Sequence, residues 1–501
     1  MFDVVVVGGG PAGSAASRLL ASWGYRVAML VGLPSQHPPL AESLPPSVRK
    51  PLGALGLLST IDDSEILRSN GNTVAWAGAA LRSTAFGEGG SGLQVRRDQF
   101  DSLLQSAAAE AGVYTIHGVA RSVRLGDEEG KSFPGEVTWT GRASEGTVRG
   151  HWILDCSGRA GVVARRGLRR RHSVPSTLAV SAVWNSPSAW ELRDPSHTLV
   201  ESYPDGWAWS VPVSAAQRHV AVMVDPRKTN FERGEGLERA YRAELEKTVH
   251  HRRLLLKDAE LVVTPWACTA TPYSASGYGG KGFLLVGDAA SFIDPLSSFG
   301  VKKALASAWL AAVVVNTALK NPQMVGPAIS LFEARERIAY DGYSAQAADF
   351  YAQAAEYHRH PFWTARARAT PEPSDPLGTS PDSESVLRDP RLPAAVEYLR
   401  SAPRFQLRLA TGVSRERRPV VRGCEVVLEE QLVSPSASGG IGTVRGIDLP
   451  QLVDLLGTHE RVPDLYEAWV RERAPVEIRD LLGALSVLVA MELVEPIPAD
   501  P

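Results

Sequence analysis

The chain has 501 residues, of which 44% are apolar and 22% charged, and its formal net charge at pH 7 is −2. This length and composition predict a globular protein with two or three hydrophobic cores, and the balanced charge argues against nucleic acid as a partner. Three scattered cysteines and a first residue that leads directly into a strand give no sign of a disulfide framework or a signal peptide, so we expect a cytoplasmic protein.

The beginning of the chain predicts a strand, a tight turn, a helix and a second strand. The apolar run 2–7 leads into a glycine turn in which Gly8, Gly10 and Gly13 match the pattern G-x-G-x-x-G. Small residues let such a turn approach a pyrophosphate, and the N–H groups that begin the helix face the phosphate oxygens. We therefore predict a dinucleotide site, although Val31 stands near the end of the second strand, where an acidic residue is usual.

The next segments predict mixed structure. Two prolines, Pro45 and Pro46, favour an extended lead-in to a helix that reaches residue 58. Residues 73–95 are typical of strands around a glycine-rich turn, and Arg97 opens an amphipathic helix that reaches residue 111.

The middle of the chain predicts β-structure and then returns to the first pattern. A strand at 151–156 ends in a sharp polar turn, and alternating runs between 176 and 263 predict an antiparallel sheet. The apolar strand 283–286 then precedes Gly287-Asp288 and a long helix through residue 319. Residues 304–319 fall short of the roughly 20 apolar residues of a membrane span, so we expect a buried helix and no span.

The C-terminal region predicts helices to about residue 369, a linker at 370–389 and a further domain. That domain should contain a strand at 425–432 and helices at 448–456, 462–471 and 477–491. It resembles a winged-helix module and is similar to PqqD-like elements, which capture a peptide by adding it as a strand. The alternative is a structural cap on the preceding domain.

Two of these motifs together resemble those of a known superfamily. The turn Gly8–Gly13 and the stretch Gly287–Val301 are similar to the two flavin motifs of flavoprotein monooxygenases and flavin-dependent halogenases with the p-hydroxybenzoate-hydroxylase-like fold. The resemblance covers about residues 1–370 and implies FAD, with Asp288 accepting from a ribityl hydroxyl and Arg97 near the pyrophosphate or the ring. The FAD-binding residues that it implies are Gly8, Gly10, Pro11, Ala12, Gly13, Glu42, Ser43, Arg97, Gly158, Gly287, Asp288, Pro295, Gly300 and Val301.

The resemblance to halogenases is incomplete. Residues 207–212, Trp-Ala-Trp-Ser-Val-Pro, look like the halogenase signature W-x-W-x-I-P with Val in place of Ile. Halogenases carry hypohalous acid to a lysine near the substrate, but residues 73–95 contain no lysine and only one basic residue, Arg82. An arginine cannot replace that lysine, because it stays protonated. The loop 297–300 also has serine and phenylalanine where tryptophan halogenases have glutamate and threonine.

The chain resembles more closely the LodB-like and GoxB-like flavoproteins, which modify tryptophan in a partner protein. The residues that carry this resemblance are 41–47, 69–76, 94–101 and 155–161. It implies hydroxylation, in which reduced flavin and O2 form a C4a-hydroperoxide that an electron-rich ring attacks.

Candidates for the catalytic and substrate-binding residues follow from the same resemblance. Trp76, Trp207, Trp209 and Phe299 would form apolar walls of a substrate pocket, or alternatively belong to the core. Candidates for proton transfer are Glu42, His37 and Asp294, each of which has a purely structural alternative. We predict no metal site.

The sequence therefore predicts an α/β protein with a discontinuous Rossmann-type FAD-binding domain (1–75, 96–175 and 270–330) and an antiparallel-sheet substrate domain (76–95 and 176–269). A helical segment with a linker (331–389) and a winged-helix-like domain (390–501) would follow. The predicted activity is FAD-dependent hydroxylation of an aromatic group, indole or tryptophan, either free or within a peptide or protein. The electrons would come from NAD(P)H or from a separate flavin reductase. The alternatives are a halogenase, a reductase of the geranylgeranyl-reductase type and a non-catalytic flavin-binding protein.

Overall fold

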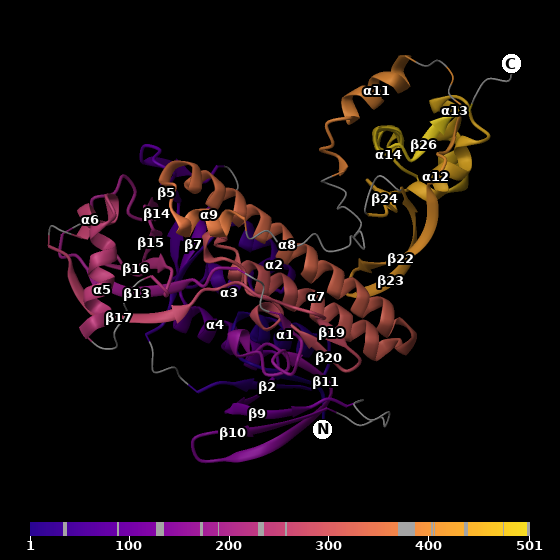
Figure 1. Ribbon diagram of the computed structural model, residues 1–501. Coiled ribbons are helices and arrows are strands. Elements are labelled where there is room, and N and C mark those ends of the chain that lie inside the picture. The colour runs from indigo at the N-terminus through magenta and orange to yellow at the C-terminus, as the bar shows by residue number, and fades with distance from the viewer. Residues whose placement is uncertain are drawn as a thin grey trace. The chain divides into compact units, whose positions relative to one another are not determined.

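The computed structural model divides into two compact units, Met1–Asn316 with Glu336–Glu372, and Thr317–Arg335 with Pro373–Pro501 (Figure 1). It describes residues 1–33, 38–87, 90–126, 135–170, 174–188, 190–228, 235–255, 258–368, 386–401, 404, 406–434, 439–473 and 475–497. His37 and most of the predicted linker lie outside these residues. The finer domain boundaries given above stay a prediction.

An eight-stranded sheet forms the first layer of the larger unit. Its central order is β19-β20-β11-β1-β2-β8, and β10 pairs with both β11 and β9. The strands are β1 (Phe2–Val7), β2 (Val27–Val31), β8 (Tyr114–His117), β9 (Val119–Arg124), β10 (Gly135–Thr140), β11 (Glu145–Asp155), β19 (Gly279–Gly280) and β20 (Phe283–Leu285). β1, β2, β8, β11 and β20 run parallel. The central strands β1 and β2 are apolar and mostly buried on both faces, as expected for a parallel sheet, whereas the edge strand β8 is largely exposed.

The register of this sheet brings three sequence motifs together. Val7 pairs with Asp155 and with Leu30, while Asp155 also pairs with Leu285. The glycine turn after β1, the polar turn after β11 and the Gly287 turn after β20 therefore meet at one edge. Ligands of such sheets bind at the carboxyl ends of the strands.

A seven-stranded sheet forms the second layer, in the order β17-β13-β16-β15-β14-β5-β6. Its strands are β5 (Gly71–Ala75), β6 (Arg82–Ala85), β13 (Leu178–Asn185), β14 (Thr198–Tyr203), β15 (Gly206–Pro212), β16 (Gln217–Val224) and β17 (Glu260–Thr269). Only β5 and β14 pair in parallel; the other neighbours are antiparallel, as predicted for 176–263. Helices α5 (Glu235–Glu246) and α6 (His250–Leu255) lie beside this sheet in Figure 1.

Smaller elements complete the larger unit. A three-stranded sheet has the order β3-β7-β4, and β12 pairs with β18. The bounds are β3 (Ala41–Leu44), β4 (Leu67–Ser69), β7 (Gly92–Arg96), β12 (Arg169–Arg170), β18 (Ser274–Ala275), α1 (Pro11–Ser22), α2 (Arg49–Ala54), α3 (Leu58–Asp62) and α4 (Arg97–Glu110). The short 3-10 turns of this unit are η1 (Pro46–Val48), η2 (Gly158–Ala160), η3 (Gly287–Ala289) and η4 (Pro295–Ser297). A further 3-10 turn, η5 (Pro322–Met324), belongs to the smaller unit. The single helix predicted up to residue 58 is wrong, because η1, α2 and α3 divide that segment around Gly56, which has a φ of +65°.

Long helices follow the second glycine motif. They are α7 (Gly300–Lys320), α8 (Val325–His358) and α9 (Pro361–Ala367). The apolar segment 304–319 is a mostly buried helix, as predicted. Among the described residues, no helix is both long enough and apolar enough to span a membrane.

The smaller unit has its own hydrophobic core, which includes Leu432, Leu452, Trp469 and Leu485. Its elements are α11 (Leu392–Ser401), β21 (Leu407–Leu409), β22 (Ser414–Arg422), β23 (Glu425–Val433), β24 (Thr443–Val444), β25 (Ile447–Asp448), α12 (Leu449–Leu456), α13 (Val462–Glu472), α14 (Ile478–Ala490) and β26 (Val494–Pro496). The predicted strand and three helices are therefore confirmed. Their role in peptide recognition stays a prediction.

Candidate functional site

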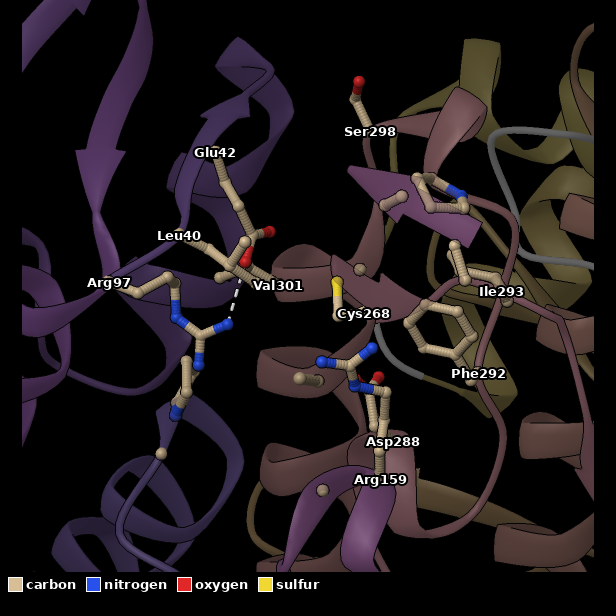
Figure 2. Close-up of a pocket in the computed structure, with 18 of the residues that line it drawn as sticks. Leu40, Glu42, Arg97, Arg159, Cys268, Asp288, Phe292, Ile293, Ser298 and Val301 are labelled. Atoms are coloured by element: carbon tan, nitrogen blue, oxygen red, sulfur yellow. Dashed lines mark hydrogen bonds and ion pairs between the residues drawn. The ribbon is translucent and has the colours of Figure 1, made fainter. Parts of the chain in front are cut away.

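A cavity of about 460 Å³ lies between the glycine turn and one face of the seven-stranded sheet (Figure 2). Its walls come from the turn after β1, from β3, from the turn after β11 and from the segment 286–304. Figure 2 shows Arg97 and Glu42 on one side, opposite Asp288, Arg159 and Cys268. The cavity thus joins the three motifs of the first sheet to the Trp-x-Trp strand of the second.

The glycine turn forms a cradle that side chains would fill. Gly8 has a φ of +117°, and a Cβ placed on it would overlap the carbonyl oxygen of Cys156. A Cβ on Gly13 would overlap the carbonyl oxygen of Gly8. Helix α1 has no side-chain N-cap and no acidic residue in its first turn, so its first N–H groups and positive dipole end are left for a ligand. This geometry fits the pyrophosphate of FAD.

The buried Asp155 shapes the neighbouring turn. One carboxylate oxygen accepts from the backbone N–H and the hydroxyl of Ser157 at 3.1 and 2.5 Å, and the other accepts from the N–H groups of Val163 and Ala164 at 2.7 and 3.2 Å. Both oxygens are therefore used inside the protein. Gly158, with a φ of +60°, lines the cavity from this turn.

Arg97 lies between two carboxylates at the cavity wall. Its Nη1 donates to Oε1 of Glu42 at 2.8 Å, and Nε and Nη2 donate to the two oxygens of Asp101 at 3.1 Å each. Burial opposes the positive charge, but the two carboxylates raise the pKa of Arg97 above its ordinary value. Burial also raises the pKa of Asp101. Arg97 therefore stays cationic, and Nη2 lies 3.7 Å from the Cβ position of Gly10, beside the phosphate cradle.

The second glycine motif supplies the opposite wall. Asp288 lines the cavity from η3, and the hydroxyl of Tyr273 donates to its backbone carbonyl at 2.7 Å. Burial raises the pKa of Asp288, while the cations Lys303, Arg97 and Arg159 lower it. Helix α7 begins at Gly300, which also lines the cavity.

Strand β15, which carries the Trp-x-Trp motif, supplies the apolar wall of the cavity. Because side chains alternate along a strand, Trp207 and Trp209 point to the same face of β15, and both line the cavity. Trp209 pairs with Ala221 of β16, while Trp207 pairs with Met223, which also lines the cavity. Cys268 of β17 joins this wall.

Two other aromatic candidates lie elsewhere. Trp76 is not among the cavity-lining residues: its Nε1 donates to the backbone carbonyl of Phe350 at 3.0 Å, and its ring packs edge-on against Trp207 and Trp363. Phe299 also does not line the cavity, and its ring packs at a tilt against Tyr343, with ring centroids 5.0 Å apart. Their assignment to the substrate pocket has no support from this geometry.

Of the three proton-transfer candidates, Glu42 and Asp294 line the cavity and His37 lies outside the described residues. Asp294 accepts from the backbone N–H of Leu296 at 3.0 Å and from the hydroxyl of Tyr351 at 2.8 Å. Burial raises the pKa of Asp294. It is therefore held in place by two donors, of which Tyr351 was not identified from the sequence.

Other cavity residues also escaped sequence reasoning. Arg159 lines the cavity, donates to the carbonyl of Thr269 and lies over the ring of Phe292, 5.6 Å from its centroid. Its position directly after Gly158 in the polar turn is a signal that could have identified it. Phe292 lies within the second flavin motif, Gly287–Val301, and this is a signal that could have identified it. Nothing in the sequence around Cys268 distinguishes it from a core residue. Besides the glycines Gly8, Gly10, Gly13 and Gly287, ten residues were predicted to bind FAD, and all ten line the cavity. They are Pro11, Ala12, Glu42, Ser43, Arg97, Gly158, Asp288, Pro295, Gly300 and Val301.

A model of a protein family described as tryptophan halogenase matches residues 80–379, more than half of the chain. The chain belongs to the tryptophan halogenase family. This family member is 29% identical over 400 residues to the tryptophan 2-halogenase of Chondromyces crocatus, with 77% of this chain and 74% of that protein covered. The predicted superfamily is thereby confirmed, and FAD is the cofactor of this halogenase-family enzyme.

Two solved structures share the fold of this tryptophan halogenase family member. The flavin-dependent halogenase CmlS gives a TM-score of 0.75 at 22% identity, covering 99% of this chain and 96% of CmlS. QhpG, a peptidyl tryptophan dihydroxylase essential for tryptophylquinone cofactor biogenesis, gives a TM-score of 0.67 at 23% identity, covering 95% of this chain and all of QhpG (100%). The predicted fold class is confirmed. As a member of this family the chain is an FAD-dependent enzyme of the oxidoreductase type, rather than a non-catalytic flavin carrier.

Proposed function

We propose that this enzyme hydroxylates an electron-rich aromatic ring, an indole or a tryptophan side chain, with FAD and O2. The proposal rests on which cationic side chains line the cavity. Among the lining residues that the structure describes, the cations are Arg97 and Arg159, and no lysine is present.

The missing lysine bears on the reaction because halogenases are expected to load hypohalous acid on a lysine amine. An amine can do this only when it loses a proton, whereas a guanidinium stays protonated in proteins. Arg97 is also paired with Glu42 and Asp101. These two arginines are therefore suited to hold phosphate or to stabilise negative charge, and not to carry a halogen.

When bound in this cavity, reduced FAD would supply activated oxygen from O2. The atoms balance when a hydroxyl group containing one oxygen atom of O2 replaces a ring hydrogen, the other oxygen atom leaves as water, and the reduced flavin contributes two electrons and two protons. Those electrons come from NAD(P)H or through a separate flavin reductase. The protein must exclude water and hold the ring carbon near the flavin.

The apolar wall and one carboxyl group serve these needs. The flat indole rings of Trp207 and Trp209 and the flexible side chain of Met223 can pack against an aromatic ring. Asp294 is the better placed of the two described carboxyl candidates to take the ring proton, because Glu42 is bound to Arg97. The hydroxyl of Tyr351 orients the Asp294 carboxyl group.

We further propose that the ring belongs to a residue within a peptide or protein. A free amino acid would bring an ammonium and a carboxylate, which are costly to bury without partners. The described lining residues from the seven-stranded sheet and the end of β17 are uncharged. They are Ala179, Ser181, Thr198, Val200, Trp207, Trp209, Met223, Cys268, Thr269 and Ala270. The peptidyl substrate named for QhpG, which shares the fold, supports the same substrate class.

Halogenation is the second candidate, because the family model and the curated relatives are named for it. A direct test incubates the FAD-loaded enzyme, a flavin reductase, NADH and O2 with blocked tryptophan, meaning N-acetyl-tryptophan amide, in the presence of chloride or bromide. Mass spectrometry should detect added oxygen with either salt. A chlorinated or brominated product would establish halogenation instead. Free tryptophan, assayed in parallel, should react more slowly than the blocked form, and a preference for free tryptophan would contradict the peptide substrate.

A further inference from the structure

Lys303 is a buried lysine that lies behind the second glycine motif. Its side chain is 2% exposed, and it is not among the residues that line the cavity. Its Nζ donates to the carbonyl oxygens of Gly287 at 3.0 Å and Ser291 at 2.8 Å. An ammonium group is costly to bury, and these two acceptors at the ends of one short turn offset that cost. The turn between them carries Asp288, which does line the cavity.

Helix α7 fixes this turn through a second side chain. Ser307, one helical turn beyond Lys303 on the same face, accepts from the backbone N–H of Gly287 at 3.0 Å. Gly287 has a φ of +65°, and a Cβ on it would lie 3.1 Å from the Cβ of Ala12 and 3.3 Å from that of Ala304. Both backbone polar groups of Gly287 are therefore held by α7, and the turn has little room to shift.

Charged groups from several elements surround this arrangement. Oε2 of the buried Glu336 in α8 lies 3.9 Å from Nζ of Lys303. The charged groups that act on Asp288 are Lys303 of α7, Glu42 of β3, Arg97 of α4 and Arg159 of η2. Burial raises the pKa of Asp288, and the positive charge of Lys303 is the largest effect that opposes burial. Lys303 therefore favours the carboxylate form of Asp288 without reaching the cavity.

We propose that Lys303 is a positioning residue for FAD, which holds the turn Gly287–Ser291 and keeps the Asp288 carboxylate ready to accept from a flavin hydroxyl. Lys303 itself does not touch the cofactor. This role requires FAD in the cavity, and it is independent of whether the product is hydroxylated or halogenated.

The test is a double-mutant cycle on FAD affinity. Apoprotein of the wild type, Lys303→Met, Asp288→Asn and the double variant is titrated with FAD, and quenching of flavin fluorescence gives Kd across a range of pH. Each single variant should bind FAD about tenfold more weakly than the wild type. Because Lys303 acts through Asp288, the double variant should bind no more weakly than Asp288→Asn alone.

The pH dependence gives a second readout that loss of packing alone would not produce. FAD affinity should fall as pH drops through the pKa of Asp288, and removal of the Lys303 charge should move that fall to higher pH. Should Lys303→Met not fold, Lys303→Gln keeps a donor without the charge and should give the same upward shift. Lys302→Met is the matched control, because Lys302 contacts the ring of Phe299 and not the turn. Unchanged affinity in both Lys303 variants, effects that multiply in the double variant, or no pH shift would overturn the proposal.

Discussion

The guanidinium of Arg97 donates to the carboxylate of Glu42 at 2.8 Å and thereby joins the first residue of α4 to the strand β3 at the cavity wall. The same guanidinium binds both oxygens of Asp101 one helical turn further on. One cation thus satisfies two carboxylates beside the phosphate cradle.

We expect Arg97→Met to weaken FAD binding and to destabilise the fold by about 1–3 kcal/mol, because it leaves two partly buried carboxylates without their donor. Urea unfolding and FAD titration measure the two effects. Arg96→Met is the control: Arg96 forms an exposed pair with Asp98 at 2.7 Å, whose loss should cost at most about 1 kcal/mol. Equal losses in the two variants would contradict the role assigned to Arg97.

Gly13→Ala should abolish or strongly reduce flavin binding, because its Cβ would overlap the carbonyl oxygen of Gly8 in the turn. Absorbance of the purified protein after addition of FAD reports the bound flavin. Gly53→Ala, in α2, adds a Cβ that meets no atom within 4 Å and should leave the flavin content unchanged. Full flavin loading of Gly13→Ala would show that the turn is not the phosphate site.

Trp209 and Trp76 should respond differently to replacement. Trp209→Ala removes part of the cavity wall, so it should raise KM for the aromatic substrate with little change in FAD affinity. Trp76→Phe loses the hydrogen bond to the Phe350 carbonyl, so it should lower the free energy of unfolding by about 1 kcal/mol and leave KM unchanged. Steady-state kinetics and urea unfolding separate these outcomes. A raised KM in Trp76→Phe would indicate that Trp76 does contact the substrate.

His219 should make the fold sensitive to mild acid. Its fully buried ring lies between Trp209 and Trp266, at centroid distances of 5.4 and 5.6 Å, and burial lowers its pKa from 6.5 to about 4. The unfolded chain therefore binds a proton below pH 6.5 that the folded protein excludes until about pH 4. Stability should be complete above pH 6.5 and should fall by about 3 kcal/mol as pH drops to 4.

His219→Leu should flatten that part of the stability profile, measured as the free energy of unfolding in urea between pH 4 and pH 7. Burial also lowers the pKa of His251, so some slope of the same sign should persist in the variant. Glu201, whose pKa is lowered from 4.5 to about 2, contributes stability that is lost only as pH falls below about 4.5, at the acid end of this window. An unchanged slope in His219→Leu would contradict the assignment.

Much of the fold could be predicted from short patterns in the sequence. The apolar strand before Gly287 and the apolar helix after it were predicted because their signals lie within a few residues of each other, and β20 and α7 confirm them. The Trp-x-Trp motif likewise made Trp207 and Trp209 candidates for the apolar wall, and both line the cavity. Such features depend on spacing that a single sequence displays.

Contacts between distant residues could not be predicted in this way. The parallel pairing of Thr73 with Leu199, and the hydrogen bond from Tyr351 to Asp294, depend on how whole elements pack. The position of Trp76 outside the cavity lining has a local cause. Trp76 follows β5 immediately before Ala77, whose φ of 52° begins a turn, and its indole donates to α8 instead of lining the cavity. A positive φ at an alanine has no sequence signal.

We propose that this cavity holds FAD beside an aromatic ring and that the enzyme transfers oxygen to the ring without a halogen carrier. The most direct measurement is a single turnover in which anaerobically reduced holoenzyme and a blocked tryptophan peptide are mixed with isotopically labelled O2 in bromide-containing buffer. Mass spectrometry of the peptide should then find labelled oxygen on the indole and no bromine. A brominated indole, or an unmodified peptide after the flavin has been reoxidised, would contradict the claim.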